Sequence, residues 1–175
     1  MPKTTTSKST KPPTPAKSSK SSKSKSPKRS KPVPPATHIE IISRGVIIQN
    51  GHVLLCRNRK GNYYYLPGGH VDPGENSADA LARECVEEFG GKVAVGDLLA
   101  VAEVQFATKK GMNQELNLLY AAELVKPSAK KDLPQVTSKE DWIDFAWLMV
   151  EEVAAADVRP DCFQDWLVET MTGAE

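Results

Sequence analysis

The sequence predicts a mixed α/β domain in which helices cover both faces of a mixed central sheet, preceded by a disordered basic arm. Three observations support this fold class. Apolar, β-branched runs stand before and after one strongly periodic helical segment, without the regular alternation of a parallel α/β protein. A loop rich in Gly and Pro leads into that helix. The first 37 residues, by contrast, contain no aromatic residue and almost nothing apolar.

The N-terminal arm, residues 1–37, differs in charge from the rest of the chain. It holds ten Lys or Arg and no Asp or Glu, whereas the whole chain holds 23 basic and 22 acidic residues. Residues 38–175, the predicted folded domain, therefore have 13 basic and 22 acidic residues and a net charge of −9. Such an arm cannot bury enough surface to offset the entropy of ordering, so we expect a solvated tether. The alternative is non-specific contact with nucleic acid through its positive charge.

Targeting signals and cysteines limit the compartment. The sequence shows neither a signal-peptide core nor an apolar stretch long enough to span a membrane, so we expect no membrane partner. The cysteines are far apart and odd in number, which favours a reducing compartment and three small buried side chains: Cys56, Cys85 and Cys162. We expect a cytoplasmic protein, with a nuclear location left open by the short basic run SPKRSKP. A monomer and a homodimer both remain open.

The folded part begins near His38 with two apolar runs on either side of Asn50-Gly51. This dipeptide predicts a tight hairpin turn, because both central residues must take positive φ. The segment YYYLPGGHVDPGEN, residues 63–76, follows and predicts the end of a strand and then a loop.

A helix is predicted after this loop. Asn76 is its expected N-cap, with Asp79 as the capping-box partner three residues on. Gly90-Gly91 is the expected end. Between them, apolar residues recur at helical spacing and form one stripe: Ala78, Leu81, Ala82, Cys85 and Phe89.

The remainder of the chain predicts three more strands and two closing helices. The strands are expected at residues 92–107, 116–125 and 142–150, and the helices at residues 150–157 and 161–171.

Three glutamates on the predicted helix call for an explanation. Glu84, Glu87 and Glu88 are spaced so that they point the same way, and like charges at this spacing destabilise a helix. They have no lysine four residues on that would relieve the repulsion. The simple interpretation is a solvated helix surface. However, a loop containing Gly68 and Gly69 leads directly into them, and oxygen ligands beside open backbone suit Mg²⁺ or Mn²⁺.

These residues also form a known motif. Gly69, Glu75 and the run Arg83-Glu84-Cys85-Val86-Glu87-Glu88-Phe89-Gly90 are spaced as in the Nudix box of the Nudix hydrolases, G-x5-E-x7-R-E-U-x-E-E-x-G-U, where U is apolar. Every charged and glycine position is met, and only the last apolar position, Gly91, departs. The chain therefore resembles a Nudix hydrolase over roughly residues 38–170, which implies an α/β/α sandwich fold.

The resemblance also implies roles for individual residues. Glu84, Glu87 and Glu88 would hold divalent cations, with the carbonyl of Gly68 as a further ligand. Arg83 and Glu75 would brace the loop and orient a metal-binding glutamate.

The general base and the substrate contacts are less defined. The base could be a box glutamate, or Glu140 or Asp141 in the loop before the last core strand, with Glu115 as a third possibility. Further candidates for substrate binding are Arg44, Arg57 and Arg59, since guanidinium pairs well with phosphate, and Tyr65, whose ring could stack on a base.

The expected activity is Mg²⁺-dependent hydrolysis of a diphosphate linkage in a nucleoside diphosphate derivative. Nucleoside triphosphates, ADP-ribose and nucleotide sugars all remain open as the small-molecule substrate, with nucleoside triphosphates slightly ahead. The alternative is a nucleotide-sensing or RNA-end-processing module that the basic arm tethers to nucleic acid.

Overall fold

The computed structural model describes residues 38–109, 111–125 and 133–173. The basic arm, residues 1–37, lies outside the described residues, so its predicted disorder and the domain boundary stay predictions.

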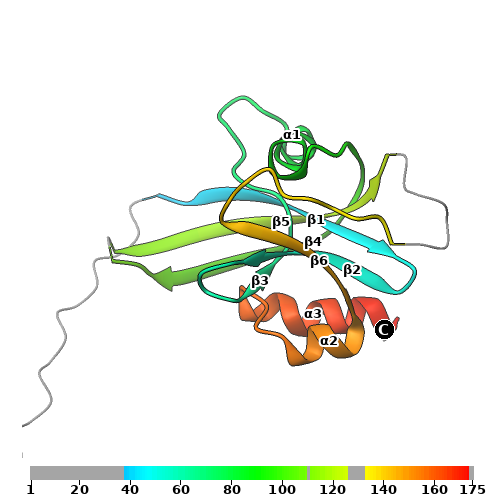
Figure 1. Cartoon of the computed structure of the whole chain (residues 1–175). Coiled ribbons are helices and arrows are strands. Elements are labelled where there is room, and N and C mark those ends of the chain that lie inside the picture. Colours follow the sequence, from blue (N-terminus) through cyan, green and yellow to red (C-terminus); the bar gives the residue numbers. More distant parts are fainter. Residues whose placement is uncertain (1–37, 110, 126–132, 174–175) are drawn as a thin grey trace, which may run out of the picture. The chain divides into compact units, whose positions relative to one another are not determined.

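The domain is an α/β/α sandwich (Figure 1). Helix α1 lies on one face of the sheet, and helices α2 and α3 lie together on the other face, as the sequence predicts. The elements in chain order are β1 (Glu40–Gln49), β2 (His52–Asn58), β3 (Tyr64–Tyr65), α1 (Ser77–Phe89), β4 (Val93–Ala107), β5 (Met112–Leu124), β6 (Ile143–Met149), α2 (Val150–Ala155) and α3 (Asp161–Thr172). All the predicted elements are present; β5 begins four residues earlier than expected.

The predicted hairpin joins β1 to β2. Asn50 and Gly51 have φ of 50° and 74°, the positive values that a two-residue turn of this kind needs. The flanking strands pair antiparallel at Ile48–Val53 and Gln49–His52.

The sheet is mixed, because β1 runs parallel to β5 while its other pairings are antiparallel. Its strand order is β3-β2-β1-β5-β4, and β6 pairs with the remaining edge of β2. Beyond the hairpin, a loop takes the place of β2 beside β1. Gly45 N donates to Pro67 O at 2.9 Å, Ser43 N to Gly69 O at 2.8 Å, and Val71 N to Ile41 O at 2.9 Å. This loop, residues 67–71, therefore enters the gap where the two strands part.

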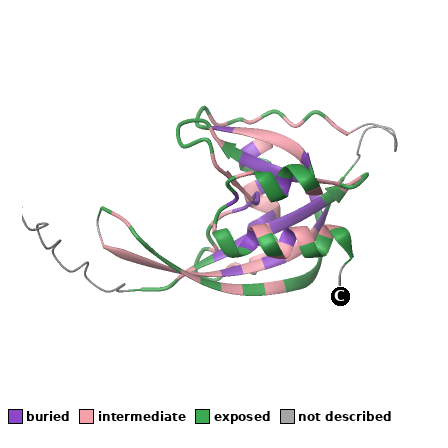
Figure 2. Ribbon diagram, turned by 90° about the horizontal axis from the view of Figure 1, so that it is seen from below, coloured by how far each residue is buried: buried purple, intermediate pink, exposed green. Residues whose placement is uncertain are grey.

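Two apolar cores fill the sandwich, one on each face of the sheet. One lies between the sheet and helices α2 and α3, and includes Leu55, Leu119 and Phe163. The other lies between the sheet and α1, and includes Leu54, Leu81 and Cys85. The C-terminal part of β4 and the N-terminal part of β5 extend past the helices, and their residues are half-buried or exposed (Figure 2).

The ends of α1 agree with the prediction, but the capping box does not. Asn76 is the N-cap residue, yet within the described residues its side chain makes no capping hydrogen bond. Ser77 instead shares a hydrogen bond of 2.6 Å with the hydroxyl of Tyr120 on β5, and this contact fixes the helix start against the sheet. At the other end Gly90 has φ of 73°, the left-handed conformation that favours glycine.

One prediction about the cysteines was wrong. Cys56 and Cys85 are buried, but Cys162 is exposed at the start of α3. It lies in the first turn of that helix, next to the buried Phe163. Among the described residues, no helix is long and apolar enough to cross a membrane.

Candidate active site

The loop that replaces β2 beside β1 brings glycine backbone against α1. Gly68 has φ of 120°, and a side chain there would overlap the carbonyl oxygen of Ser43. A side chain at Gly69 would overlap the carboxyl group of Glu84. Gly68 therefore requires glycine, and a side chain at Gly69 would displace the Glu84 carboxylate, which lies directly against the loop backbone.

Arg83 holds the loop and the acidic face of α1 together. Its Nε and Nη2 donate to the two carboxylate oxygens of Glu75 at 2.9 and 3.0 Å, so the expected pairing is present and bidentate. Nη2 also donates to the carbonyl of His70 at 2.9 Å. The guanidinium lowers the pKa of Glu75, chiefly through these hydrogen bonds. The loop is thus tied to the first turns of the helix.

The same guanidinium relieves the repulsion between two of the glutamates. Its Nη1 donates to Glu84 at 3.0 Å and to Glu87 at 3.3 Å. The sequence argument that nothing in the helix relieves this repulsion was therefore wrong, because Arg83 is itself the i, i+4 partner of Glu87. The two carboxylates share one cationic group in this structure.

Glu88 differs from the other two glutamates. Its side chain is buried, with 5% of its surface exposed, rather than projecting from the acidic face. One carboxylate oxygen accepts a hydrogen bond from the Gly68 amide at 3.1 Å, and the other is 3.9 Å from the Cys56 sulfur. The expected common face of three carboxylates is thus a pair, Glu84 and Glu87, with Glu88 inside the protein behind the loop.

Burial raises the pKa of Glu88 to about 7. Desolvation is the main cause, and the negative charges of Glu84 and Glu140 add to it. The Gly68 amide and the Arg44 guanidinium act in the opposite direction. Near neutral pH the metal-free protein therefore holds this carboxyl group partly protonated.

The loop before β6 contacts the end of α1. Lys139 N donates to the carbonyl of Glu88 at 2.7 Å, and its ammonium donates to the carbonyl of Val86 at 3.0 Å. This places a cation at the negative end of the helix. The adjacent Glu140 is half-buried, and its Oε2 has no hydrogen-bond partner among the described residues. Asp141 is exposed. Of the two carboxylates predicted in this loop, Glu140 is the one near Glu88.

The three candidate arginines are separated by the structure. Arg44 lies at the site, where its Nη1 donates to the carbonyls of Gly68 at 2.8 Å and Leu66 at 3.1 Å. Arg57 instead binds Asn62. Arg59 binds Asp144 through Nε and Nη2, at 3.1 and 2.7 Å. Both of the latter are occupied by neighbouring side chains, so the structure gives no support to their predicted contact with phosphate.

A cleft of about 720 Å³ opens beside Arg44. Aromatic rings line it on one side, from Tyr63, Tyr65 and Trp142, and β4 and β5 contribute Phe106 and Glu115. The Arg44 guanidinium lies 5.7 Å from the centre of the Tyr65 ring. Two further candidates from the sequence, Tyr65 and Glu115, therefore share one cleft with Arg44.

Comparison with known proteins decides the family. A model of the NUDIX domain matches residues 40–167. The chain belongs to the Nudix hydrolase family. Nucleoside triphosphatase NudI of Salmonella agona (strain SL483) is 31% identical over 123 residues, which cover 65% of this chain and 84% of that protein. NudI of Escherichia fergusonii is 32% identical, with the same coverage of each chain.

Solved structures of Nudix proteins have the same fold. A NUDIX hydrolase from Nitrosomonas europaea superposes with a TM-score of 0.61 and 21% identity, over 78% of this chain and 90% of that chain. The MutT protein from Methanosarcina mazei Go1 gives a TM-score of 0.58 and 22% identity, over 77% and 94%. At this identity the likeness concerns the fold alone.

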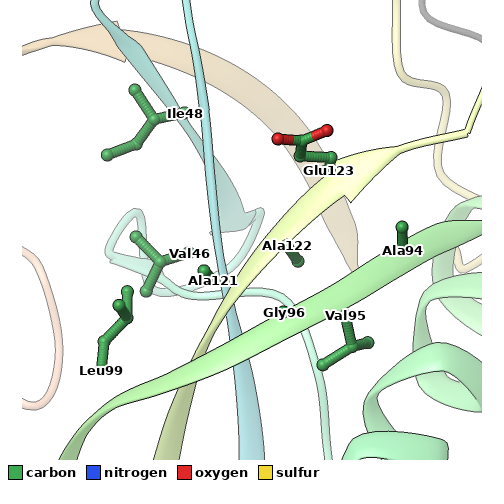
Figure 3. Close-up of a pocket in the computed structure, with 9 residues that line it drawn as sticks. All are labelled: Val46, Ile48, Ala94, Val95, Gly96, Leu99, Ala121, Ala122 and Glu123. Atoms are coloured by element: carbon green, nitrogen blue, oxygen red, sulfur yellow. The ribbon is translucent and has the colours of Figure 1, made fainter.

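A second hollow of this Nudix hydrolase has the wrong chemistry for phosphate. It measures about 340 Å³ and lies over β1, β5 and β4, on the stretch drawn in Figure 3. Small and apolar residues line it, such as Val46, Gly96 and Ala121, and its one charged lining residue is Glu123. This hollow has no basic side chain among its lining residues, whereas the cleft beside Arg44 is lined by two arginines, Arg44 and Arg159.

The Nudix box residues carry oxygen atoms that suit a divalent metal, although their side chains do not surround a common point in this structure. Among the residues that the structure describes, no three side chains of His, Cys, Asp or Glu come together as a metal-binding group. Glu84 and Glu87 nevertheless already share a cationic partner, and the missing side chain of Gly69 leaves room for the Glu84 carboxylate. Carboxylate and carbonyl oxygens are the ligands that Mg²⁺ and Mn²⁺ prefer. The residues present therefore fit such an ion.

Proposed function

We propose that this Nudix hydrolase cleaves a diphosphate linkage in a nucleoside diphosphate derivative, with nucleoside triphosphates ahead of ADP-ribose and nucleotide sugars. One observation carries the proposal: Arg44 contacts the glycine loop beside the carboxylates of α1 and also a ring of the aromatic cleft. The place proposed for the phosphates, at the glycine loop, is therefore next to the place proposed for the base, in the aromatic cleft. The name nucleoside triphosphatase, given to the bacterial relatives, supports the same substrate class.

The proposed metal is Mg²⁺ or Mn²⁺, held by Glu84, Glu87, Glu88 and the carbonyl of Gly68. When bound, such a cation neutralises phosphate charge and lowers the pKa of the attacking water. The protein prepares this place in three ways. Arg83 orients Glu84 and Glu87, the Gly68 amide orients Glu88, and the fixed loop backbone presents the Gly68 carbonyl.

Glu140 is the proposed general base. It is half-buried, and its Oε2 is buried without a hydrogen-bond partner among the described residues, so that oxygen keeps an unused acceptor position beside Glu88. The loop segment that precedes it is held in place. Lys139 binds the end of α1, and Ser138 exchanges hydrogen bonds of 3.0 Å with the backbone of Glu140. Asp141 and Glu115 are less suited, since the first is exposed and the second accepts from Asn117 at 3.3 Å.

A panel of substrates tests this function. The full chain is incubated with Mg²⁺ and each of the deoxynucleoside and ribonucleoside triphosphates, ADP-ribose and nucleotide sugars, and products are identified by mass. We expect release of phosphate or pyrophosphate from triphosphates, with loss of turnover in Glu84→Gln. Glu123→Gln, which changes the same charge far from the site, is the matched control. Unchanged turnover in excess chelator would overturn the metal assignment.

The second candidate is action on an RNA end, or sensing of a nucleotide, with the arm bound to nucleic acid. The observation that favours it is the charge of residues 1–37, with ten basic and no acidic side chains. An RNA with a 5′-triphosphate belongs in the same panel. Faster turnover of that RNA than of free triphosphates would favour this candidate, and binding of nucleotides without any turnover would favour the sensor.

A further inference from the structure

Trp142 is a large aromatic side chain that the fold leaves uncovered. It immediately precedes β6, and 52% of its surface is exposed. The other two tryptophans differ from it. Trp147 donates through its indole to the carbonyl of Pro134 at 2.8 Å, and Trp166 packs against the core beneath α3. Trp142 therefore contributes less to the core than either of them, and its exposed surface faces the cleft.

Trp142 and Tyr65 form one aromatic wall. Their ring planes are 9° from parallel and their centroids are 6.5 Å apart, a spacing that fits an offset stack. Tyr63 extends the wall, with its centroid 6.0 Å from that of Tyr65. The Tyr65 ring is half-buried, and its hydroxyl is buried without a hydrogen-bond partner among the described residues. Because Tyr65 supports it on one side, Trp142 presents a flat apolar surface to the cleft.

Arg59 fixes the position of Trp142. The amide of Arg59 donates to the carbonyl of Trp142 at 3.0 Å, and its Nη1 donates to the carbonyl of Asp141 at 2.8 Å. The same guanidinium binds the side chain of Asp144 on β6. The arginine that sequence reasoning placed on phosphate thus clamps the backbone on both sides of the ring. An aromatic surface held in this way is ready for a flat ligand without further ordering.

The aromatic wall opens onto the proposed phosphate site. Arg44 spans the two, with its guanidinium over the Tyr65 ring and its Nη1 on the Gly68 carbonyl. A ligand that reached both places would need a flat apolar group at one end and a negatively charged group at the other. A nucleotide has both parts, because its base is flat and its phosphates are negatively charged.

We propose that Trp142, supported by Tyr65, is the residue that binds the nucleobase of the substrate and selects nucleotides over other diphosphates. Base stacking on an aromatic side chain contributes to affinity with little preference among bases, because each base has a π-face. The ligand class rests on the proposed function, but the binding test below needs neither metal nor turnover. Failure of hydrolysis and failure of this inference therefore give different results.

The test uses tryptophan fluorescence of the full chain in excess chelator. AMP and UMP are the probes, and ribose 5-phosphate is the matched compound without a base. We expect both nucleotides to quench the fluorescence saturably and ribose 5-phosphate to leave it unchanged. In Trp142→Phe the quenching should disappear, while calorimetry shows AMP affinity within about threefold of the wild type, because phenylalanine still stacks. In Trp142→Ala the affinity should fall at least fivefold.

The kinetic counterpart separates a binding role from a merely structural one. With a substrate from the panel, Trp142→Ala should raise KM at least fivefold and leave kcat within about twofold. Trp166→Phe, a change at a tryptophan outside the cleft, should leave KM and the AMP quenching unchanged. Equal quenching by ribose 5-phosphate, no quenching by either nucleotide, or wild-type AMP affinity in Trp142→Ala would each overturn the inference.

Discussion

The Nη1 atom of Arg44 donates a hydrogen bond of 2.8 Å to the carbonyl oxygen of Gly68, the backbone group proposed as a metal ligand. The contact crosses from β1 to the loop that replaces β2, so it fixes the loop where the two strands part. The same guanidinium also binds the carbonyl of Leu66. Arg44 therefore links the sheet, the loop and the cleft.

Arg44→Ala should lower kcat/KM by roughly 10- to 100-fold, because a hydrogen bond from a charged group contributes about 1.5–3 kcal/mol. Arg44→Lys should recover little of this loss, since the guanidinium binds both carbonyls through Nη1 while its planar group lies over the Tyr65 ring, and a compact ammonium cannot make both kinds of contact. Steady-state kinetics with the best substrate of the panel would measure both. Arg57→Ala is the control, because Arg57 binds Asn62 instead. Similar losses in Arg57→Ala and Arg44→Ala would contradict the role given to Arg44.

Glu140 and Asp141 are adjacent in sequence but differ in their surroundings. Glu140→Gln should reduce kcat by about 10²- to 10⁴-fold, the usual contribution of a general base. Asp141→Asn should stay within about twofold of the wild type, because the side chain of Asp141 is exposed. The ratio of the two kcat values, measured at saturating substrate, decides between them. A larger loss in Asp141→Asn would move the base to that residue.

Local sequence signals predicted most of the fold. The Asn50-Gly51 turn, the Gly90 helix end and the strands each depend on a few neighbouring residues, so their positions could be read directly. The pairing of β1 with β5 and the separation of β1 from β2 depend on contacts between distant segments. No local sequence pattern specifies which distant strands pair. The position of the loop beside Gly45 could therefore not be predicted from the sequence.

The sequence indicated which residues belong to the candidate site, but not the surroundings of each side chain. The box pattern identified Glu84, Glu87 and Glu88, yet helical spacing alone could not show that Glu88 turns inward onto the Gly68 amide. The i, i+4 pair of Arg83 with Glu87 depends on local spacing alone, so the sequence is sufficient to predict it. Trp142 was expected as the first residue of the strand 142–150, and no local pattern indicated that its ring would be exposed and would line a cleft.

Deleting residues 1–36 tests the arm as a separable tether. Turnover of a small nucleotide should stay nearly unchanged, because the arm contains no residue of the box. Binding to nucleic acid should weaken, and in the full chain it should fall steeply with added salt, as expected when lysines displace counterions. Filter binding at two salt concentrations, with and without the arm, measures this. Equally tight binding by the truncated domain would place nucleic-acid contact in residues 38–175.

Millimolar Mg²⁺ should raise the melting temperature of the full chain, since a ligand that binds the native state alone stabilises it by mass action. The double variant Glu84→Gln, Glu87→Gln should lose this response. A matched double variant, Glu123→Gln with Glu169→Gln, removes the same charge from two exposed positions outside the site and should respond like the wild type. An equal Mg²⁺ shift in the two double variants would locate the metal elsewhere.

The buried carboxyl group of Glu88 should make the stability of the metal-free protein depend on pH. Its pKa is about 7 in the folded protein and near 4.5 in the unfolded chain, so between these values the folded state holds a proton that the unfolded chain has released. The free energy of unfolding should therefore fall as the pH rises from about 4.5 to 7 and stay lower above that range.

Glu88→Gln removes this ionisation while keeping an oxygen for the Gly68 amide. In excess chelator at pH 8 the variant should be more stable than the wild type, by up to about 3 kcal/mol for a pKa difference of this size. At pH 5 the difference should fall below about 1 kcal/mol, because this pH is only slightly above the pKa of the unfolded chain and the folded wild type is then protonated. Urea unfolding at pH 5, 6, 7 and 8 measures the difference, with Glu123→Gln as the exposed control. A stability difference that stays constant across this range would show that Glu88 ionises normally in the folded protein.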